Sequence, residues 1–451
     1  MSESGDHLLG LLDEVVNQAR SGEGVEAYGV DSTETTIKAY DAAVESLSSA
    51  RTRGVGIRVV ADGRVGYAYT ADLGEEALAE TLADARSNAT VGTPDEANVL
   101  PSCGQLPAMP ELYDDAFAAV DTTDKVALAV RLESAARQAP SIKGVDTAQY
   151  GDTLVTAAIA STAGTRGSYR RCDAFCFVEV LAEAEGRTTA AFGLDMARLP
   201  SDLDVEAAAR EGVARATRLL GGRQPASARL PIMFDPYATA SFLGVLAGAL
   251  SAESVQKGRS LFAERLGESV GPAHLTLVDD GRLPGAPASA PWDGEGVPTG
   301  RTPLIDAGVV TGWLHNTYTA TKAGSSSTGN ASRGGFKSPP SISPTNLFLD
   351  PGEESQEALL ARAGTAFYCQ QVMGVHSGAN PISGDFSVGA AGLMVRDGAF
   401  AEPVREATVA GTIPGMLAGL VAVGSDLRFL PFGGGMGGAT LLLEGMTLAG
   451  A

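Results

Sequence analysis

The chain has 451 residues, including 56 Gly, and a formal net charge of −21 from 33 Lys and Arg against 54 Asp and Glu. Such a chain repels phosphate, and its densest basic spot, Arg170 and Arg171, is too small to bind nucleic acid. With 44% hydrophobic residues the chain can fill a core, so disorder is excluded and two or three domains are expected. We interpret the acidity as a source of solubility and not as the mark of a particular partner.

The cysteines and the apolar segments indicate a soluble, cytoplasmic protein with no membrane span. Four cysteines are too few for a disulfide scaffold, and buried reduced thiols are the favoured interpretation. The N-terminus has no basic region and no long apolar stretch, so we expect no signal peptide. The longest uncharged run, residues 407–425, contains Pro414 and four glycines, and is better explained by a strand, a turn and a helix than by a membrane span.

The first 92 residues predict an N-terminal domain of helices and a β-meander. Apolar residues at helical spacing predict helices over residues 6–20 and 75–88. Between them, Asp62-Gly63 predicts a tight hairpin turn. The β-like runs on either side of this turn cover residues 25–30, 35–40, 47–53, 54–61 and 65–70.

A Pro-rich linker over residues 93–118 leads to a middle α+β region at 119–225. This region begins with a helix predicted at 123–139 and ends with another at 205–220. The intervening meander, residues 143–194, is divided by three turn signals. They are Gly151-Asp152, Ala163-Gly164 and Glu185-Gly186.

Residues 226–451 are richer in Gly and Pro and predict a mostly β C-terminal domain. Only residues 238–251 and 354–363 are expected to be helical there. The predicted fold class is therefore α+β, without an internal repeat.

Common sequence motifs for cofactor and cation binding do not identify a function for this chain. The pattern at Gly433, Gly435 and Gly438 matches a dinucleotide fingerprint, but a strand is expected after it instead of the helix that pyrophosphate binding needs. Four carboxylates could form a cation site, but their spacing fits no EF-hand loop, and solvated loop acids are the preferred interpretation. These acids are Asp279, Asp280, Asp293 and Glu295.

The four histidines, at positions 7, 274, 315 and 376, are not spaced to hold zinc on one helix face. His274 and His315 are interpreted as hydrogen-bonded scaffold, whereas His376 begins a polar, turn-rich stretch typical of a cleft. A catalytic triad can be assembled from Ser377, His315 and Asp385, but the sequence does not fix its geometry.

Six polar, Gly-rich segments stand out in the second half, at residues 258–262, 278–280, 292–299, 316–320, 327–331 and 376–389. Together they resemble the TldD/PmbA family, once called modulators of DNA gyrase and viewed as a two-subunit metallopeptidase. In the N-terminal half, Gly54-Val55-Gly56-Ile57-Arg58-Val59 and the segment from Asp62 to Ala68 are similar to that family as well. The most specific element, HSGANPISGDFSVGAAG at 376–392, resembles the PmbA (TldE) branch more than the TldD branch.

The departures from the TldD branch suggest the role of this chain. That branch places H-E-x-x-x-H on the helix corresponding to residues 238–251 and a Cys ligand near the C-terminus. Here the helix has no His, only Glu253 lies beside it, and the last cysteine is Cys369. The resemblance therefore implies a subunit with no metal or other cofactor of its own. It would pair with a metal-bearing TldD-like paralogue that holds the zinc, and could form a homodimer when alone.

The resemblance also implies a shared cavity that admits unfolded or short peptides in extended form. Gly-rich loops let a substrate backbone approach, and Asn and Ser offer donors and acceptors. The predicted peptide-binding residues are Asn316, Thr328, Gly329, Asn330, His376, Ser377, Gly378 and Asn380, and the predicted structural or cavity acids are Asp280, Asp293 and Glu295. The equally weighted alternative is that these residues close tight turns in the β domain.

Three functions follow as hypotheses. The leading one is the non-metal subunit of a zinc metallopeptidase that processes or degrades unfolded or modified peptides. The second is a self-sufficient hydrolase that uses Ser377 or Asp293. The third is a peptide-binding module without catalysis.

Overall fold

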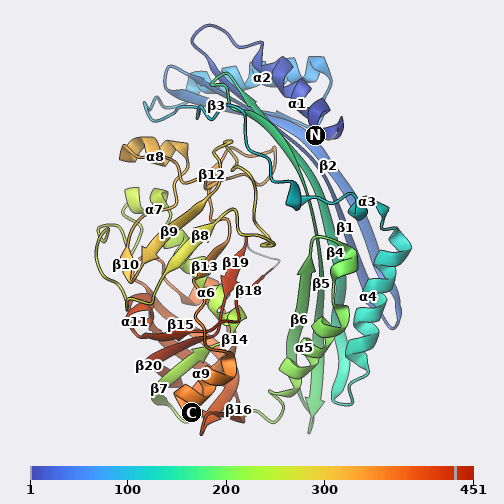
Figure 1. Ribbon diagram of the computed structural model, residues 1–451, viewed down its shortest axis with the longest axis vertical. Helices are drawn as coiled ribbons and strands as arrows, with labels where there is room; N and C mark the ends of the chain where they lie inside the picture. The colour runs from blue at the N-terminus through green and yellow to red at the C-terminus, as the bar shows by residue number, and fades with distance from the viewer. Residues whose placement is uncertain (1–2, 431–433, 451) are drawn as a thin grey trace.

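Six antiparallel strands from the first 200 residues, five of them long, form one curved sheet, the blue-to-green band of Figure 1. The computed structural model describes residues 3–430 and 434–450. In the order β3-β2-β1-β4-β5-β6, the sheet takes strands from both segments predicted at 1–92 and 119–225, so one sheet joins them. Its strands are β1 (Gly24–Tyr40), β2 (Ala43–Ala61), β3 (Arg64–Thr70), β4 (Ile142–Ser161), β5 (Arg166–Ala184) and β6 (Arg187–Ala197).

These strands are longer than the sequence pattern predicts. The runs predicted separately within residues 25–40 and within 47–61 merge into β1 and β2. The turn predicted at Gly151-Asp152 is wrong, because both residues lie inside β4. A Cβ on Gly151 would come 2.3 Å from Cε1 of Phe175, so this glycine makes room for a ring. The other three turns are confirmed, with left-handed glycines at Gly63, Gly164 and Gly186.

Helices cover the curved sheet and bury its apolar side chains. Leu12 of α1 and Leu82 of α2 pack with Ile57 of β2, while Leu132 of α4 packs with Val178 of β5. The helices and helical turns of this half are α1 (Glu3–Val16), α2 (Glu75–Val91), η1 (Pro110–Leu112), α3 (Ala116–Ala119), α4 (Thr122–Arg137), η2 (Pro200–Asp202) and α5 (Val205–Thr217). The four longer helices match those predicted to within a few residues.

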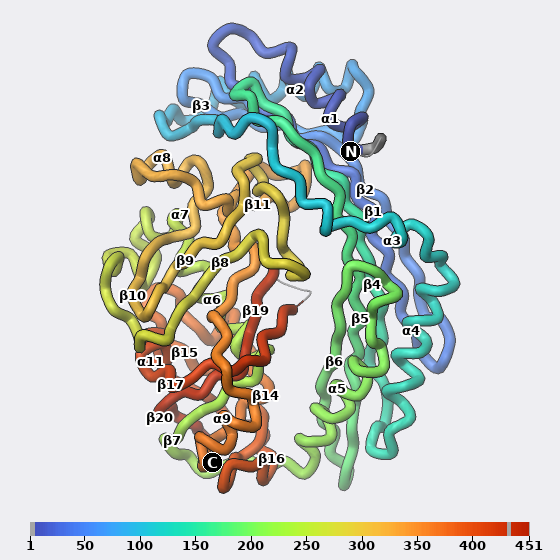
Figure 2. The backbone as a smooth tube through the Cα atoms, viewed as in Figure 1, coloured from blue at the N-terminus to red at the C-terminus, as the bar shows by residue number. Residues whose placement is uncertain are grey.

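The C-terminal domain contains two six-stranded sheets, whose backbone is traced from yellow-green to red in Figure 2. The first has the order β10-β9-β8-β13-β19-β18 and the second the order β16-β15-β14-β7-β20-β17. The strands of the first are β8 (Leu277–Asp280), β9 (Arg301–Asp306), β10 (Val309–Val310), β13 (Leu347–Leu349), β18 (Arg428–Phe429) and β19 (Met436–Gly438). Those of the second are β7 (Ala228–Phe234), β14 (Ala366–Met373), β15 (Asp385–Arg396), β16 (Ala399–Thr412), β17 (Leu420–Val423) and β20 (Leu441–Ala449). A short pair is formed by β11 (Ala331–Ser332) and β12 (Ser341–Ile342).

One helix, α6 (Pro236–Ala249), packs between these two sheets and contacts strands of both. Phe242, Leu243 and Leu246 of α6 lie in the main apolar cluster of the domain. Gly438 of β19 packs so closely on α6 that a Cβ would lie 1.8 Å from the carbonyl oxygen of Pro236. Packing against both sheets fixes the position of α6, and one face of the helix is left uncovered by them.

The C-terminal domain has more helices than the sequence pattern predicts. Besides α6 and α9, four short helices form, so the expectation of only two helical segments was wrong. They are too short for apolar periodicity to show, and side-chain caps start two of them, at Asn316 and Thr412. The five helices after α6 are α7 (Ala252–Gln256), α8 (Thr317–Ala323), α9 (Gln356–Ala363), α10 (Val375–Gly378) and α11 (Ile413–Ala418). The predicted α+β class is confirmed.

Two further sequence features can be compared with the structure. The uncharged run at 407–425 forms the end of β16, then α11 and β17, so a strand and a short helix form as predicted, but the helix follows the strand directly and a second strand comes after it. None of the described helices is both long and apolar enough to cross a membrane. Of the rejected dinucleotide pattern, Gly433 lies outside the described residues, and the strand β20 follows Gly438 as expected.

Candidate functional site

Buried charges join the curved sheet to the C-terminal domain. Arg58 of β2 donates to Glu26 of β1 and to Glu295 of the C-terminal domain, each at 2.7 Å. Arg333 pairs with the second oxygen of Glu26, and its guanidinium lies 4.8 Å from the ring centre of Tyr28. Burial opposes the charge of Arg58, but the two carboxylates hold its pKa above the ordinary value. We refer to Glu26, Arg58, Glu295 and Arg333 as the interdomain charge cluster.

Asp293 organises the turn beside this cluster. Its Oδ1 accepts from the backbone N–H of Glu295 and of Val297, both at 2.9 Å, and its Oδ2 accepts from the N–H of Ala331 at 2.9 Å. Burial, and then the charge of Glu295, raise the pKa of Asp293 to about 7. Burial alone would also raise the pKa of Glu295, but Arg58 and the N–H of Thr317 hold it below its ordinary value.

The predicted acids therefore do not share one environment. The interpretation as solvated loop acids was wrong for Asp279, Asp293 and Glu295, which are 2%, 7% and 1% exposed. Packing between domains and sheets buries them, and no local pattern shows this. Asp280 is the last residue of β8, and its Oδ1 accepts from the N–H of Arg282 in the turn that follows, at 2.9 Å.

A second buried network holds four of the predicted peptide-binding residues. Asn330 is 1% exposed, and its amide donates to Asp279 at 2.7 Å and accepts from the hydroxyl of Thr328 at 2.6 Å. Asn316 caps α8 by accepting from the N–H of Thr319 at 3.0 Å. Gly329 has a left-handed φ of 74°, and a Cβ there would come 2.7 Å from the carbonyl oxygen of Pro298. All four residues are bound within the chain, as turn and cap residues are.

The other four predicted residues lie on α10 and the loop that follows it. His376 is exposed. Asn380 closes a turn by accepting from the N–H of Ile382 at 2.8 Å, and the hydroxyl of Ser377 donates to the carbonyl of Gly374 at 3.2 Å. At Gly378, a Cβ would come 2.5 Å from the carbonyl oxygen of Ser387. Of this group, His376 is a lining residue of the cavity along α6 that is described below.

The structure does not assemble a catalytic triad from Ser377, His315 and Asp385. The His315 imidazole is buried and hydrogen-bonded through Nδ1 to the Thr319 hydroxyl at 3.2 Å. Burial lowers the pKa of His315. No hydrogen bond in the described part of the chain joins this ring to Ser377 or to Asp385.

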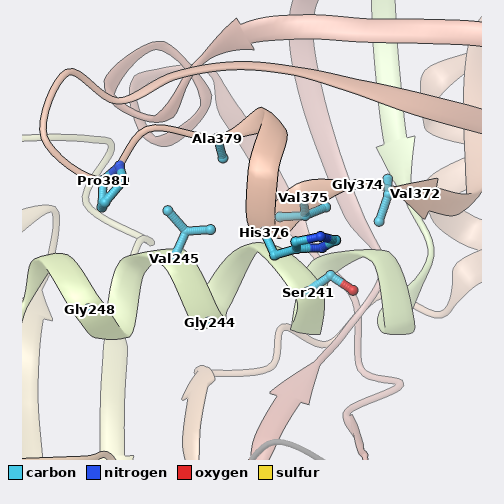
Figure 3. A pocket seen from close by; sticks show the side chains of 10 residues that line it. All are labelled: Ser241, Gly244, Val245, Gly248, Val372, Gly374, Val375, His376, Ala379 and Pro381. Atoms are coloured by element: carbon cyan, nitrogen blue, oxygen red, sulfur yellow. The ribbon is translucent and has the colours of Figure 1, made fainter.

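A groove of about 550 Å³ runs along the exposed side of α6, under the loop that carries α10. Ser241, Gly244, Val245 and Gly248 of α6 form its floor. Figure 3 shows the His376 ring above the helix near Ser241, and Val245 facing Ala379 and Pro381. The wall residues are Val372, Gly374, Val375, His376, Ala379 and Pro381. We call this cavity the α6 groove.

The α6 groove continues toward the curved sheet. A mostly apolar recess of about 400 Å³ shares Ser241 and Val372 with the groove. Phe177 of β5 and Phe192 of β6 line the recess from the sheet, with ring centres 5.6 Å apart. The two halves of the chain therefore line adjoining hollows that meet at Ser241 and Val372.

The two glycines of the groove floor are not required by the packing of this chain. A Cβ at Gly244 or at Gly248 would meet no atom within 4 Å. A glycine inside a helix costs about 1 kcal/mol relative to alanine. With two such residues on one exposed face, no side chain projects from these positions into the groove. A ligand backbone could therefore approach the helix closely.

The start of α6 is anchored by a buried ion pair. Asp235, the N-cap of α6, accepts from Arg215 of α5 at 2.6 Å and from the Tyr368 hydroxyl at 2.7 Å. Burial, and then the Asp235 charge, raise the pKa of Tyr368 well above its ordinary value. This ion pair links α6, the helix of the groove floor, to α5, one of the helices that cover the curved sheet.

The side chains of the α6 groove do not fit a zinc ion. A catalytic zinc takes three protein ligands from His, Cys, Asp or Glu. The groove offers the imidazole of His376 and the hydroxyl of Ser241. Within residues 3–430 and 434–450, no three His, Cys, Asp or Glu side chains gather closely enough to hold a metal.

Comparison with known families accounts for the fold. Profiles described as PmbA/TldA metallopeptidase match three segments: domain 1 at residues 25–89, the central domain at 115–220 and the C-terminal domain at 227–450. The chain belongs to the PmbA/TldD family of metallopeptidases, as its motifs predicted.

Individual relatives agree with this membership. Metalloprotease PmbA of Escherichia coli O157:H7 is 29% identical over 438 residues, which cover 93% of this chain and 92% of that protein. A metalloprotease of Methanothermobacter thermautotrophicus is 29% identical over 416 residues, covering 87% of this chain and 86% of that protein.

Solved structures share the whole fold. A Thermotoga maritima protein, described as a candidate modulator of a DNA gyrase, superposes with a TM-score of 0.88 at 28% identity over 98% of this chain and 99% of its own. TldE from Thermococcus kodakarensis gives a TM-score of 0.88 over 99% of each chain, and its 22% identity shows the fold alone.

The sequence analysis missed most of the groove. Of the lining residues, only His376 was predicted to bind peptide, because the prediction rested on polar residues in Gly-rich loops. The available signal was the pair Gly244 and Gly248, four residues apart inside a predicted helix. Glycines at such spacing mark one helix face that something approaches closely.

Proposed function

We propose that this chain is the non-metal subunit of a two-subunit metallopeptidase, in which a TldD-like paralogue carries the zinc. One observation carries the proposal. On the helix where the family resemblance places zinc ligands, the groove floor consists of Ser241, Gly244, Val245 and Gly248. This donor set suits a peptide and not a metal ion, so hydrolysis is assigned to the paralogue.

The substrate class follows from the chemistry of the groove. Its own lining carries no carboxylate, ammonium or guanidinium group, and the one guanidinium on the adjoining recess, that of Arg215, is paired with Asp235, so we infer no selection for acidic or basic peptides. His376 and Ser241 can each exchange a hydrogen bond with a peptide backbone, and the glycines allow that backbone to come close. Unfolded or short peptides in extended form are therefore the proposed substrates.

The other predicted residues have supporting roles in this proposal. Asn316, Thr328, Gly329 and Asn330 hold the loops of the C-terminal domain, and Ser377, Gly378 and Asn380 shape the wall that positions His376. The four cysteines are free thiols, three of them buried, which suits the proposed cytoplasmic location.

Metal analysis and a cleavage assay test the proposal. We expect the purified chain to hold no stoichiometric zinc and to leave a fluorescently labelled, unstructured decapeptide intact. Mixing it with the zinc-bearing paralogue from the same genome should give a complex that cleaves the peptide. One tightly held zinc per chain would falsify the assignment.

The same assay separates the alternatives. Cleavage by the isolated chain that Ser377→Ala or Asp293→Asn abolishes would establish a self-sufficient hydrolase. Peptide binding that the paralogue neither changes nor turns into cleavage would establish a binding module without catalysis.

A further inference from the structure

A polar cleft of about 760 Å³ lies where the chain crosses from the curved sheet to the C-terminal domain. Three segments line it: the β5–β6 hairpin, the connection between α5 and β7, and β16. Figure 2 shows the connection passing beside β16 after it leaves α5. None of the residues that line this cleft lines the α6 groove. We call it the basic cleft.

Each of the three segments brings one arginine to the basic cleft. Arg187 is the first residue of β6, Arg223 lies in the connection after α5, and Arg405 lies in β16. Arg405 pairs with Glu406 at 3.0 Å. The side chains of Arg187 and Arg223 are exposed and have no ion pair or hydrogen bond in the described part of the chain. Two guanidinium groups are therefore available to a ligand.

The surroundings of the cleft are basic, although the chain as a whole is acidic. Residues 212–234 contain four arginines and no Asp or Glu, in a chain of net charge −21. Charges on a protein surface are screened beyond about 8 Å at physiological salt, so nearby arginines set the local potential. The carboxylates that line the cleft are Glu185 and Glu406, so three cations face two anions there.

The backbone holds two of the arginines beside each other. The N–H of Arg223 donates to the carbonyl of Pro403 at 3.2 Å, and the N–H of Arg405 donates to the carbonyl of Arg223 at 3.1 Å. The β15–β16 register shifts between Val404 and Ala407, and Glu406 has a left-handed φ of 53°. A bulge of this kind turns side chains out of the regular strand pattern. The positions of both arginines are therefore set by hydrogen-bonded backbone.

We propose that the basic cleft binds a small polyphosphate. A guanidinium group donates two parallel hydrogen bonds to phosphate oxygens. Arginines from three segments match the oxygens that surround a phosphorus atom on all sides, whereas one guanidinium already satisfies a planar carboxylate. A cleft of about 760 Å³ has the size of a small-molecule site, so it has room for more than one phosphoryl group. The bound ligand joins the curved sheet, the connection and the C-terminal domain.

Isothermal titration calorimetry of the full chain with sodium tripolyphosphate tests the proposal. In metal-free buffer of constant ionic strength, we expect one saturable site per chain, with affinity falling from tripolyphosphate to pyrophosphate to phosphate. Replacing pyrophosphate by ADP shows whether an attached organic group adds affinity. Equal affinities mean that the phosphoryl groups alone are recognised, and tighter binding of ADP means that an organic polyphosphate is the preferred ligand. The absence of a saturable site for tripolyphosphate overturns the proposal.

Variants locate the site. Arg187→Ala/Arg223→Ala removes both unpaired guanidinium groups and should raise the Kd for tripolyphosphate at least about tenfold. Arg223→Lys keeps the charge but loses the bidentate geometry, and should bind with intermediate affinity. Arg282→Ala is the matched control, since Arg282 is exposed and lies outside the cleft. Equal weakening by the double variant and by the control contradicts the proposed site.

Two further measurements separate a built site from general attraction of anions. Glu406→Gln releases Arg405 from its ion pair and should tighten tripolyphosphate binding. Unchanged or weaker binding by this variant contradicts a role for Arg405. Hexaglutamate, an acidic peptide of comparable charge, should bind more weakly than tripolyphosphate. Tighter binding of hexaglutamate overturns the phosphate assignment and makes an acidic peptide the ligand.

Discussion

The polar groups of the interdomain charge cluster are buried and paired with one another, whereas the α6 groove has few polar groups and borders open space. Around Arg58, each charged group has a partner, and the side chains are buried between two domains. Along α6, a low floor of small residues faces a hollow with only two polar side chains on it. The first region holds the molecule together, whereas the second leaves room for something else.

This difference separates structural polar residues from binding ones. Asn330 and Asp293 belong to segments that resemble a binding site in sequence, but their hydrogen-bonding groups are occupied within the chain. Gly244 and Gly248 carry no functional group, but they border open space. Open space beside a residue therefore identifies the groove better than the presence of a polar side chain does.

The largest expected effect comes from opening the charge cluster. Arg58→Ala leaves Glu26 and Glu295 buried without their shared cation, and should lower the free energy of unfolding by about 3–5 kcal/mol. Denaturant titration followed by circular dichroism measures this loss. Arg396→Ala is the control, because its pair with Glu402 is half-exposed and screened by water, so its loss should change stability far less. Equal losses for both variants would show that the cluster does not hold the domains.

A pH series tests whether burial governs Asp293. Its pKa is raised to about 7, so the folded protein holds an extra proton between about pH 4 and pH 7. Stability that comes from this proton is present below pH 4 and is lost as the pH rises toward 7. The stability difference between the parent chain and Asp293→Asn should therefore shrink by up to about 1.4 kcal/mol per pH unit across that window. A difference that is constant with pH would show that Asp293 ionises normally.

Filling the α6 groove should weaken peptide binding without unfolding the protein. Gly244→Trp places an indole on the groove floor and should raise the Kd for the labelled decapeptide about tenfold, as measured by fluorescence anisotropy. Gly10→Trp is the matched control, because Gly10 is also a helical glycine with open space around its Cβ position. Equal binding by both variants would place the peptide elsewhere.

The smallest expected effect concerns the stability that α6 loses by having glycines on the groove floor. Gly244→Ala and Gly248→Ala meet no obstacle, and each should raise the free energy of unfolding by about 0.5–1 kcal/mol. Thermal and denaturant unfolding measure this gain. A loss of stability instead would mean that these glycines serve the packing of the chain, and would remove the argument for a ligand.

Local sequence patterns predicted the longer helices and three of the four turns, but they missed the short helices of the C-terminal domain and most of the site. The hairpin at Asp62-Gly63 depends on the backbone conformations that these two residues tolerate, so the pattern sufficed. Gly151 looked the same in sequence, but it lies inside a strand because the Phe175 ring occupies the space above it. Such a packing glycine depends on a residue 24 positions away.

By itself, the sequence determined the class of fold, the family and the absence of zinc-ligand spacing, because these depend on residue identity and short-range order. Only the tertiary structure decided that Asp293 and Glu295 are buried, since a C-terminal loop must first meet the curved sheet. It also decided which glycines border open space. Burial and open space depend on contacts between distant segments, and no local pattern records them.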